Sequence, residues 1–463
     1  MNRQADRKID FLEGAPFGQI VRFSLPLAAT GVLQLLFNAA DTIVVGKFSG
    51  SNSLAAVGAT GSLINLLIGA FIGISIGSNI LIARYIGSRQ REKTETAVHT
   101  SLVLSLLLGA IVTALGLVFS EPMLRMMDTP DEILPLSALY LRIYFLGMPG
   151  SVLYNFGAAI LRADGDTKRP LIFLSVSGVV NVILNLVLVI AFRLDVAGVA
   201  IATTVSQYVA VAMLLRSLFR EEGWCRVELK KLRMDWREAL RMIQIGLPAG
   251  LQSVMYSVSN IVVQASVNGF GTDVVAAYTA YGKIDSVFWM TMSSFGLSIT
   301  TFVGQNFGAK QYGRVKKGVL QCAGMAFAAT ALLMALVLPL GSWVYRFFVP
   351  DQTVIHEGLR ILHFLVPVWP TYVLIEVLSG AVRGTGDSLI PMLMTSFGVC
   401  VLRIVWIVAV ALPFWPSLNG VLTCYPLSWA FTSVLFLAYY LQGGWLRRRI
   451  RVQEAAETAP ATD

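Results

Sequence analysis

Carboxylate and amide side chains occur inside apolar stretches of this sequence, where burial changes their chemistry. Asp41 lies in one such stretch after Pro26, and Asn181 and Asn185 lie in another. Residues four positions apart share one face of a helix, so the two amides are expected side by side. A charged carboxylate in hydrocarbon is costly, so Asp41 must take up a proton, pair or bind a cation. The alternatives are a helix cap near Gly46 for Asp41 and interhelical hydrogen bonds for the asparagines.

A second group of ionisable and aromatic residues lies in later apolar stretches. It comprises the charged residues Lys283, Asp285, Glu376 and Arg403 and the aromatic residues Tyr256, Tyr281, Trp289 and Tyr372. The two positive and two negative side chains could neutralise one another as buried ion pairs. In the functional alternative, Glu376 or Asp285 faces a cleft and attracts a cationic compound, which the aromatic rings contact through their faces.

The composition places these side chains in an integral membrane protein. Hydrophobic residues make up 56% and charged residues 14% of the 463 residues, whereas soluble proteins carry about 25% charged residues. This excludes a soluble enzyme and a secreted scaffold. The net charge of +9 comes from basic residues in short loops, which membrane topology and anionic lipid explain without nucleic acid. The four cysteines have no metal-ligand spacing and support neither a disulfide framework nor a zinc site.

Apolar runs predict an all-α fold with twelve transmembrane helices. A hydrocarbon layer of about 30 Å requires roughly 20 helical residues, and runs such as 101–119 lack the alternation of β-barrel strands. The expected spans start near Ile20, Leu54, Ala97, Ala138, Leu171, Val196, Ile243, Val274, Gly318, Leu359, Leu389 and Gly420. With both termini cytosolic, 28 basic residues lie on the cytosolic side and six on the other. The positive-inside rule therefore predicts a multi-pass protein of the cytoplasmic membrane in this orientation.

The two halves of the sequence repeat with an offset of about 221 to 223 residues. Asn38 aligns with Asn260, and Arg162-Ala-Asp-Gly-Asp166 aligns with Arg383-Gly-Thr-Gly-Asp387. Six helices therefore repeat as six helices in the same orientation, which is the usual plan of an alternating-access transporter. The predicted organisation is a first lobe at 1–219, a cytosolic linker at 220–241, a second lobe at 242–446 and a cytosolic tail at 447–463.

Several short motifs resemble the MATE family, the multidrug and toxic compound extrusion transporters. They are Pro26 with Asp41-Thr-Ile-Val-Val-Gly46, Gly198-Val-Ala-Ile-Ala-Thr203, Val303-Gly-Gln-Asn-Phe-Gly-Ala309 and Arg383-Gly-Thr-Gly-Asp387. The resemblance covers essentially the whole chain. It implies a V-shaped pair of six-helix lobes that exports organic cations or other amphipathic compounds in exchange for Na⁺ or H⁺.

The resemblance also implies a cation site in the first lobe. In related bacterial and archaeal members this site combines an Asp from span 1, an Asn and an Asp from span 5, and a Thr from span 6. Asp41, Asn181 and Thr203 match that pattern, but Asn185 stands at the second acidic position. The difference removes one formal charge, so both H⁺ and Na⁺ remain candidates, with a preference for H⁺.

Another branch of the family carries its essential carboxylates in spans 7 and 10. The corresponding positions here are Tyr256 and Tyr372, with Glu376 one turn from Tyr372. That second-lobe site is therefore expected to be absent in its usual form.

Energy is expected to come from an ion gradient, because the sequence has no phosphate-binding Gly-x-x-x-x-Gly-Lys-Ser/Thr loop and no enzyme-like arrangement of residues. We expect a monomer without a cofactor, whose partners are a small drug or organic cation and membrane lipid. The alternative within the superfamily is a flippase for lipids or polysaccharide precursors. Such a protein needs a strongly cationic cleft, for which only Lys283 and Arg403 are candidates. A receptor or channel would not require two repeated lobes.

Overall fold

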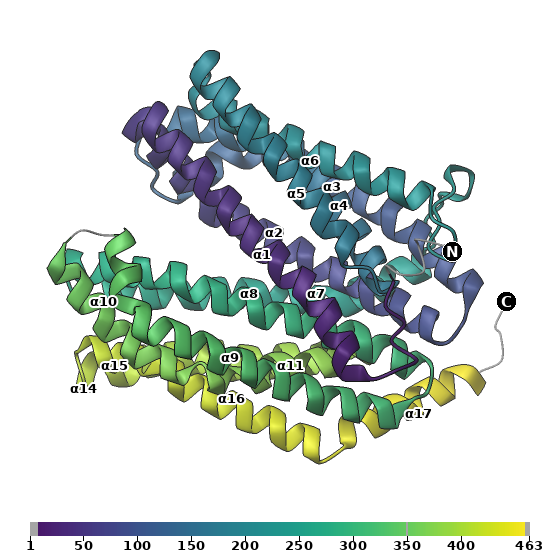
Figure 1. Ribbon diagram of the computed structural model, residues 1–463. Coiled ribbons are helices and arrows are strands. Elements are labelled where there is room, and N and C mark those ends of the chain that lie inside the picture. Colours follow the sequence, from purple (N-terminus) through teal and green to yellow (C-terminus); the bar gives the residue numbers. More distant parts are fainter. Residues whose placement is uncertain (1–7, 349–350, 459–463) are drawn as a thin grey trace. The chain divides into compact units, whose positions relative to one another are not determined.

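The computed structural model describes residues 8–348 and 351–458, and every regular element within them is a helix (Figure 1). The first six spans are α1 (Pro16–Phe48), α2 (Gly50–Gly87), α3 (Arg91–Met126), α4 (Leu134–Ala163), α5 (Lys168–Asn185) continued by the π-helix η1 (Leu186–Ala191), and α6 (Asp195–Phe219). The linker contains η2 (Leu229–Lys231).

The later spans include three that are interrupted. The uninterrupted later spans are α7 (Trp236–Asn268), α8 (Thr272–Gly308) and α9 (Tyr312–Phe348). The next span consists of α10 (Gln352–Leu365), η3 (Val366–Val368) and α11 (Pro370–Gly384), and the one after it of α12 (Leu389–Thr395), η4 (Ser396–Val401), α13 (Leu402–Val405), η5 (Trp406–Ala411) and α14 (Leu412–Phe414). The last span consists of α15 (Leu418–Leu422) and α16 (Cys424–Leu441). The helix α17 (Gly444–Thr458) follows them.

These helices correspond one for one to the twelve predicted spans. Ten helices in the described part of the chain are long and apolar enough to cross a membrane, and the pair α10 and α11 makes an eleventh span with a bend of 48°. Pro367 and Pro370 lie at that bend and interrupt the helical hydrogen bonding. The remaining long helix, α7, is less apolar because Gln252, Asn260, Gln264 and several serines lie along its uncharged part.

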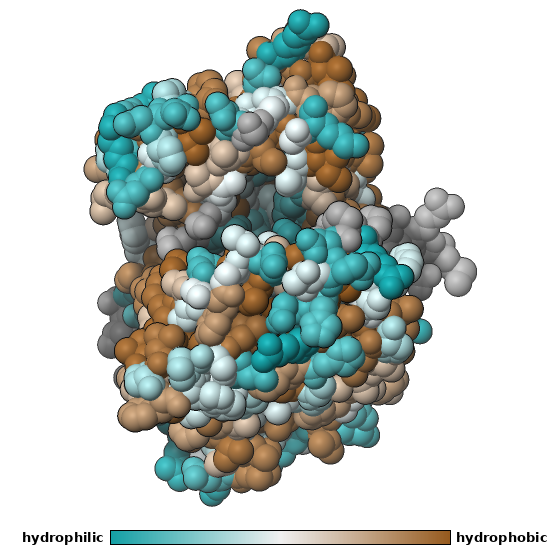
Figure 2. Space-filling view, turned by 90° about the vertical axis from the view of Figure 1, so that its left-hand side faces the viewer, coloured by the Kyte–Doolittle hydropathy of each residue, from teal (hydrophilic) through white to brown (hydrophobic). Residues whose placement is uncertain are grey.

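Large apolar side chains remain exposed along the helices. On α9, Leu320, Leu332 and Leu336 lie on the surface, which suits contact with lipid rather than water. Figure 2 views the left-hand side of Figure 1 and shows hydrophilic residues gathered among hydrophobic ones on that face.

The chain divides into two compact units. Unit 1 comprises Leu25–Gly250 with the described part of Met1–Glu13, and unit 2 comprises Gly14–Ser24 with the described part of Leu251–Asp463. The first turns of α1 therefore belong to unit 2, whereas the predicted linker 220–241 and the start of α7 belong to unit 1.

The segment 220–241 belongs to unit 1 because its backbone and side chains bond to α2 and α3. The backbone N–H of Glu228 donates to His99 Nε2 at 3.1 Å, and the N–H of Asp235 donates to Thr100 Oγ1 at 3.1 Å. Farther along, the Tyr85 hydroxyl donates to Glu238 Oε2 at 2.9 Å. These contacts fix the segment on unit 1 instead of leaving it a free connection.

Glycines allow α2 and α7 to approach closely within unit 1. Gly73 and Gly77 are four residues apart on α2, and Gly246 and Gly250 are four residues apart on α7. A Cβ atom on Gly246 would lie 2.6 Å from Cα of Ile74, and one on Gly250 would lie 2.8 Å from the backbone oxygen of Ala70. Paired small residues at this spacing are typical of closely packed membrane helices.

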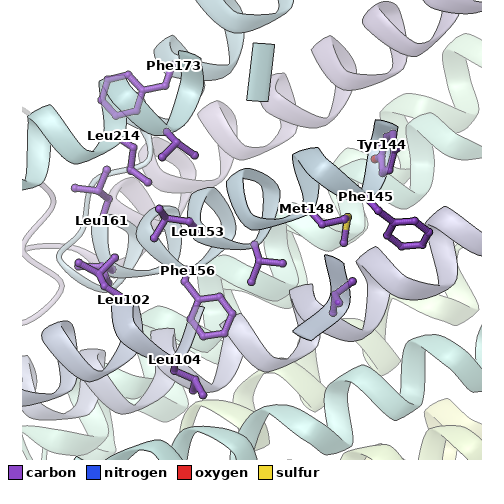
Figure 3. Packing of buried hydrophobic residues seen from close by; sticks show 14 of the residues in the cluster. Leu102, Leu104, Tyr144, Phe145, Met148, Leu153, Phe156, Leu161, Phe173 and Leu214 are labelled. Carbon is purple, nitrogen blue, oxygen red and sulfur yellow. The ribbon is translucent and has the colours of Figure 1, made fainter. Parts of the chain in front are cut away.

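Unit 1 is built around α4, which contacts α2, α3 and α6. Figure 3 shows its interdigitated apolar core, which includes Phe145, Met148, Leu153 and Phe156 of α4 with Leu102, Leu104, Phe173 and Leu214. Close packing of this kind holds the helices that carry polar residues in defined positions.

Unit 2 is centred on α8 and α11, and α11 also packs on α16. Gly380 and Gly384 of α11 lie against α8: a Cβ atom on them would lie 2.8 Å from the backbone oxygen of Gly296 and 2.7 Å from that of Thr300. The Thr300 hydroxyl donates to the Gly380 carbonyl at 3.0 Å. This close crossing brings the Glu376 side chain of α11 against α8, where a Cβ atom on Gly296 would lie 2.1 Å from its Oε1.

Candidate functional site

The four predicted residues of the first lobe form one polar cluster in unit 1. Asn185 Nδ2 donates to Oδ1 of Asp41 and lies 3.3 Å from Oδ1 of Asn181. Asn181 Nδ2 in turn lies 3.4 Å from the hydroxyl oxygen of Thr203. Both asparagines are buried, whereas Asp41 and Thr203 are partly exposed. The helices α1, α5 and α6 thus bring together residues that are far apart in the sequence.

Local features of α5 place its amides against α1. Gly178 leaves room for the Phe37 ring of α1, because a Cβ atom at position 178 would overlap that ring. Asn181 follows less than one turn later, and Asn185 is the last residue before the π-helix η1. A π-turn widens the helix and is frequent at functional sites.

Oxygen atoms dominate the chemistry that this cluster can perform. It offers one carboxylate, the amide oxygens and the Thr203 hydroxyl, and the buried Oδ1 of Asn185 has no hydrogen-bond partner among the described residues. Hard cations such as Na⁺ prefer oxygen ligands of this type, and a lone buried carboxylate can equally take up a proton. In the described part of the chain, no three His, Cys, Asp or Glu residues are grouped so that they could hold a metal ion.

Two tyrosines near this cluster were not among the predicted site residues. Tyr140 and Tyr144 of α4 stack on each other with ring centroids 6.0 Å apart, and both lie near Asp41. Their spacing of four residues in span 4 was the available signal, since it places both rings on one helix face.

In unit 2, Asp285 is surrounded by hydrogen-bond donors. Its oxygens accept from the Tyr281 hydroxyl at 3.1 Å, from Trp289 Nε1 at 2.7 Å and from Trp369 Nε1 at 3.0 Å. Tyr281, Asp285 and Trp289 recur every four residues on α8, which explains their common face. Trp369 precedes α11 and was missed, because only the bend between α10 and α11 brings it to α8.

Glu376 has its own partners on α11. The Tyr372 hydroxyl donates to Glu376 Oε2 at 3.0 Å, and Arg383 Nη2 lies 3.6 Å from Oε1. Tyr372 also approaches Tyr256, with 3.4 Å between the hydroxyl oxygens. The two positions that are acidic in another branch of the family therefore form a tyrosine pair, and Glu376 is balanced by Arg383.

Aromatic rings line the same region of unit 2. The Trp289 ring lies 4.5 Å from that of Tyr372, and Trp429 of α16 lies 5.4 Å from Tyr372, measured between centroids. Tyr256 completes the group at 6.0 Å from Trp289. Such a cluster offers ring faces and edges to a planar or cationic compound.

Arg403 is buried in α13. Its Nη1 donates to Asn260 Oδ1 at 3.0 Å, and its guanidinium carbon lies 4.4 Å from the Tyr425 ring centroid. The repeat had already aligned Asn260 with Asn38, but it did not indicate that Asn260 binds Arg403.

The predicted charges do not form a network of buried ion pairs. Lys283 is exposed, although its neighbours Tyr281 and Ile284 are buried. Among the described residues, no ion pair joins Lys283, Asp285, Glu376 and Arg403 to one another. Three of the four charges therefore lie in the interior of unit 2, and the structure does not bring Lys283 to them.

Twelve spans in two repeats of six, with a polar cluster inside the helices of each repeat, define a multi-pass membrane transporter with two parallel repeats. The family model described as MatE matches residues 26–187 and 248–408, one stretch in each half. Because the matches cover more than half of the chain, the protein belongs to the MATE family.

Individual relatives match most of the chain. Probable multidrug resistance protein YoeA of Bacillus subtilis is 29% identical over 440 residues, which cover 92% of this chain and 94% of that protein. An FAD transporter of Shewanella oneidensis is 29% identical over 318 residues, which cover 67% of this chain and 69% of that protein.

A solved structure of an outward-facing multidrug resistance MATE family transporter of the MOP superfamily shares the fold. It has a TM-score of 0.87 and 23% identity, and the match covers 98% of this chain and 99% of that chain. This likeness confirms the predicted all-α architecture of twelve helices in two lobes.

Proposed function

We propose that this protein exports drugs and organic cations in exchange for H⁺ or Na⁺ by alternating access. The observation that carries the proposal is the polar cluster of unit 1, in which Asn185 donates a hydrogen bond to Asp41, the one carboxylate among the four clustered residues. The Bacillus subtilis relative, named a probable multidrug resistance protein, supports drugs as the substrate class.

Ion coupling follows from the properties of a partly buried carboxylate. Desolvation favours protonated Asp41, whereas a bound cation favours the ionised form. A conformational change that alters access to Asp41 therefore changes its affinity for the ion, and the ion gradient can drive that change. With one carboxylate at the site, H⁺ is the preferred coupling ion, and Na⁺ is the alternative with Asn181, Asn185 and Thr203 as neutral ligands.

Substrate attraction is assigned to unit 2. Asp285 accepts hydrogen bonds from three neutral donors, and Glu376 lies one helix turn from Tyr372 in the same aromatic region. A cationic compound would gain charge attraction from the carboxylates and contact with the faces of Trp289 and Tyr372. We further propose a monomer in the cytoplasmic membrane with both termini in the cytosol.

The test is uptake of the fluorescent cation ethidium into inverted vesicles that contain the protein. A pH gradient alone and an Na⁺ gradient alone are imposed in separate samples, and vesicles without the protein serve as the control. Uptake that follows one gradient identifies the coupling ion. Uptake equal to the control under both gradients would contradict ion-coupled export.

A further inference from the structure

Arg403 presents an unusual combination of burial and incomplete bonding in unit 2. Its side chain belongs to a residue that is only 1% exposed. One nitrogen, Nη1, donates to Asn260, and the guanidinium carbon lies over the Tyr425 ring. The other two nitrogens, Nε and Nη2, are buried and have no hydrogen-bond partner among the described residues.

The position of these two nitrogens matters because the guanidinium group is planar. Nε and Nη2 direct their hydrogens from the same edge of the group, which is the edge that binds a carboxylate or phosphate through two parallel hydrogen bonds. A buried positive charge is costly without a partner of opposite charge. Arg403 therefore offers the geometry and the electrostatic demand of an oxyanion site.

The acidic residues of unit 2 do not meet this demand. Asp285 already accepts hydrogen bonds from Tyr281, Trp289 and Trp369, and Glu376 pairs with Arg383. Among the described residues, no carboxylate lies within ion-pair distance of Arg403.

A further donor lies in the same neighbourhood. The Trp429 ring lies 5.3 Å from that of Tyr425, the ring beneath Arg403, and the buried Trp429 Nε1 has no hydrogen-bond partner among the described residues. The Tyr425 hydroxyl is already engaged with Tyr278 at 2.7 Å. Arg403 Nε and Nη2 and Trp429 Nε1 are all N–H donors, which favour an anion, and they accompany ring faces that favour an aromatic compound.

Arg403 occupies the position in the second half that corresponds to a residue of the polar cluster in unit 1. Arg403 corresponds to Asn181 at an offset of 222 residues, within the range that relates the two halves. A π-helix follows the asparagines of unit 1, and π-helices flank Arg403 on both sides in unit 2. The same place in the fold therefore carries a neutral amide beside a carboxylate in one unit and a permanent positive charge in the other.

We propose that Arg403 binds the carboxylate or phosphate group of an aromatic substrate, so that zwitterionic and anionic aromatic compounds join the cations among the transported molecules. This inference rests on the proposed export function for its physiological meaning, but the binding site itself can be tested without transport.

The test is calorimetric titration of the purified full-length protein in chloride-free buffer. The probes are 1-naphthoate, 1-naphthyl phosphate and the neutral isostere 1-naphthamide. We expect an anionic probe to bind at least about tenfold more tightly than 1-naphthamide, because only the anion can engage both nitrogens. The tighter of the two anionic probes identifies the group as carboxylate or phosphate. Equal affinity for all three probes would overturn the proposal.

Four variants test the assignment of this effect to Arg403. Arg403→Gln should remove the preference for the anion, and Arg403→Lys should retain part of it, because lysine keeps the charge but cannot bind bidentately. The exposed Arg346→Gln is the matched control and should bind as the wild type does. If Arg403→Gln does not fold, Trp429→Phe keeps the ring and loses the donor, and it should weaken binding of the anion alone. An anion preference that survives both Arg403→Gln and Trp429→Phe would also overturn the proposal.

These results separate the site from the export function. Ethidium uptake without any preference for naphthoate or naphthyl phosphate would refute the anion site and leave the proposed export intact. An Arg403-dependent preference without ethidium uptake would support the site and refute the proposed export.

Discussion

Asn185 at the end of α5 donates a hydrogen bond to the Asp41 carboxylate of α1, although 144 residues separate the two in the chain. The bond leaves the amide oxygen of Asn185 buried and unpartnered among the described residues. An ion or proton at Asp41 would therefore change the hydrogen bonding of a residue that borders a π-helix. This relationship links the ionisation of one side chain to the geometry of a membrane helix.

Asp41→Asn should abolish gradient-driven efflux while substrate binding persists. The substitution keeps the size of the side chain and removes its ability to titrate. Uptake of ethidium into inverted vesicles measures coupling, and calorimetry on the purified variant measures binding. The exposed Asp131→Asn is the matched control. If Asp41→Asn took up ethidium at the wild-type rate, Asp41 would not be the coupling site, and Asp285 and Glu376 would be the next candidates.

Asn185→Asp should shift the transporter toward Na⁺. A second carboxylate beside Asp41 raises the affinity for a cation, so the Na⁺ concentration for half-maximal transport should fall by about tenfold. Transport rates at a series of Na⁺ concentrations check this expectation, with the exposed Asn268→Asp as a charge control. An unchanged Na⁺ dependence would argue that position 185 does not contact the coupling ion.

Glu376→Gln should reduce resistance to cationic compounds more than to neutral ones, by roughly three- to tenfold in inhibitory concentration. The carboxylate charge is lost while the hydrogen bond from Tyr372 can be kept. Growth assays with expression checked by immunoblotting measure the effect. Glu357→Gln, another ion-paired glutamate of unit 2, is the control. Equal loss for both classes of compound, or loss of folded protein, would instead indicate that Glu376 and Arg383 stabilise α11.

Cysteines introduced at Lys230 and Lys316 should react with impermeant thiol reagents only from the cytosolic side, as the 28 to six division of basic residues predicts. Both positions are exposed. The four native cysteines are buried and would be replaced first. A cysteine at the exposed Lys47 should react from the outside. Labelling of position 230 or 316 in intact cells would contradict the predicted orientation.

Lys8→Gln should lower stability at neutral pH by about 1–3 kcal/mol. Lys8 Nζ lies 2.5 Å from Asp164 and 2.7 Å from Glu221. Burial alone would raise the pKa of Glu221, but hydrogen bonds and charges from Lys8 and Arg169 hold it below its ordinary value of 4.5. This pairing therefore stabilises the fold above about pH 4.5 and is lost as the pH falls through the lowered folded value.

The pH dependence distinguishes this pair from a general effect of the substitution. Burial raises the pKa of Asp164 despite the opposing charge of Lys8, so the Asp164 part of the pair is lost at a higher pH than the Glu221 part. Thermal midpoints of wild type and Lys8→Gln should converge as the pH falls from 7.5 toward about 3, first as Asp164 and then as Glu221 takes up a proton. Lys231→Gln, in an exposed pair, should change little at any pH. A constant difference across this range would exclude the ion pair as its cause.

The sequence by itself determined the twelve helices, the repeat and the four residues of the unit 1 cluster. Long apolar runs permit only helices in lipid, since backbone groups must bond within the segment. Asp41, Asn181 and Asn185 could be singled out because polar residues in such runs are costly and therefore few. Thr203 was indicated by the resemblance to the MATE family.

Only the tertiary structure decided how the charges of unit 2 are paired. The sequence placed Lys283 and Asp285 two residues apart, yet a helix turns by about 200° over two residues, and the lysine lies exposed while Asp285 faces Tyr281 and Trp289. Arg383 reaches Glu376 along α11, and Asn260 meets Arg403 across 143 residues of chain. Such partners depend on helix rotation and crossing, which the packing of glycines and aromatic rings sets and which the apolar pattern along a membrane helix does not encode.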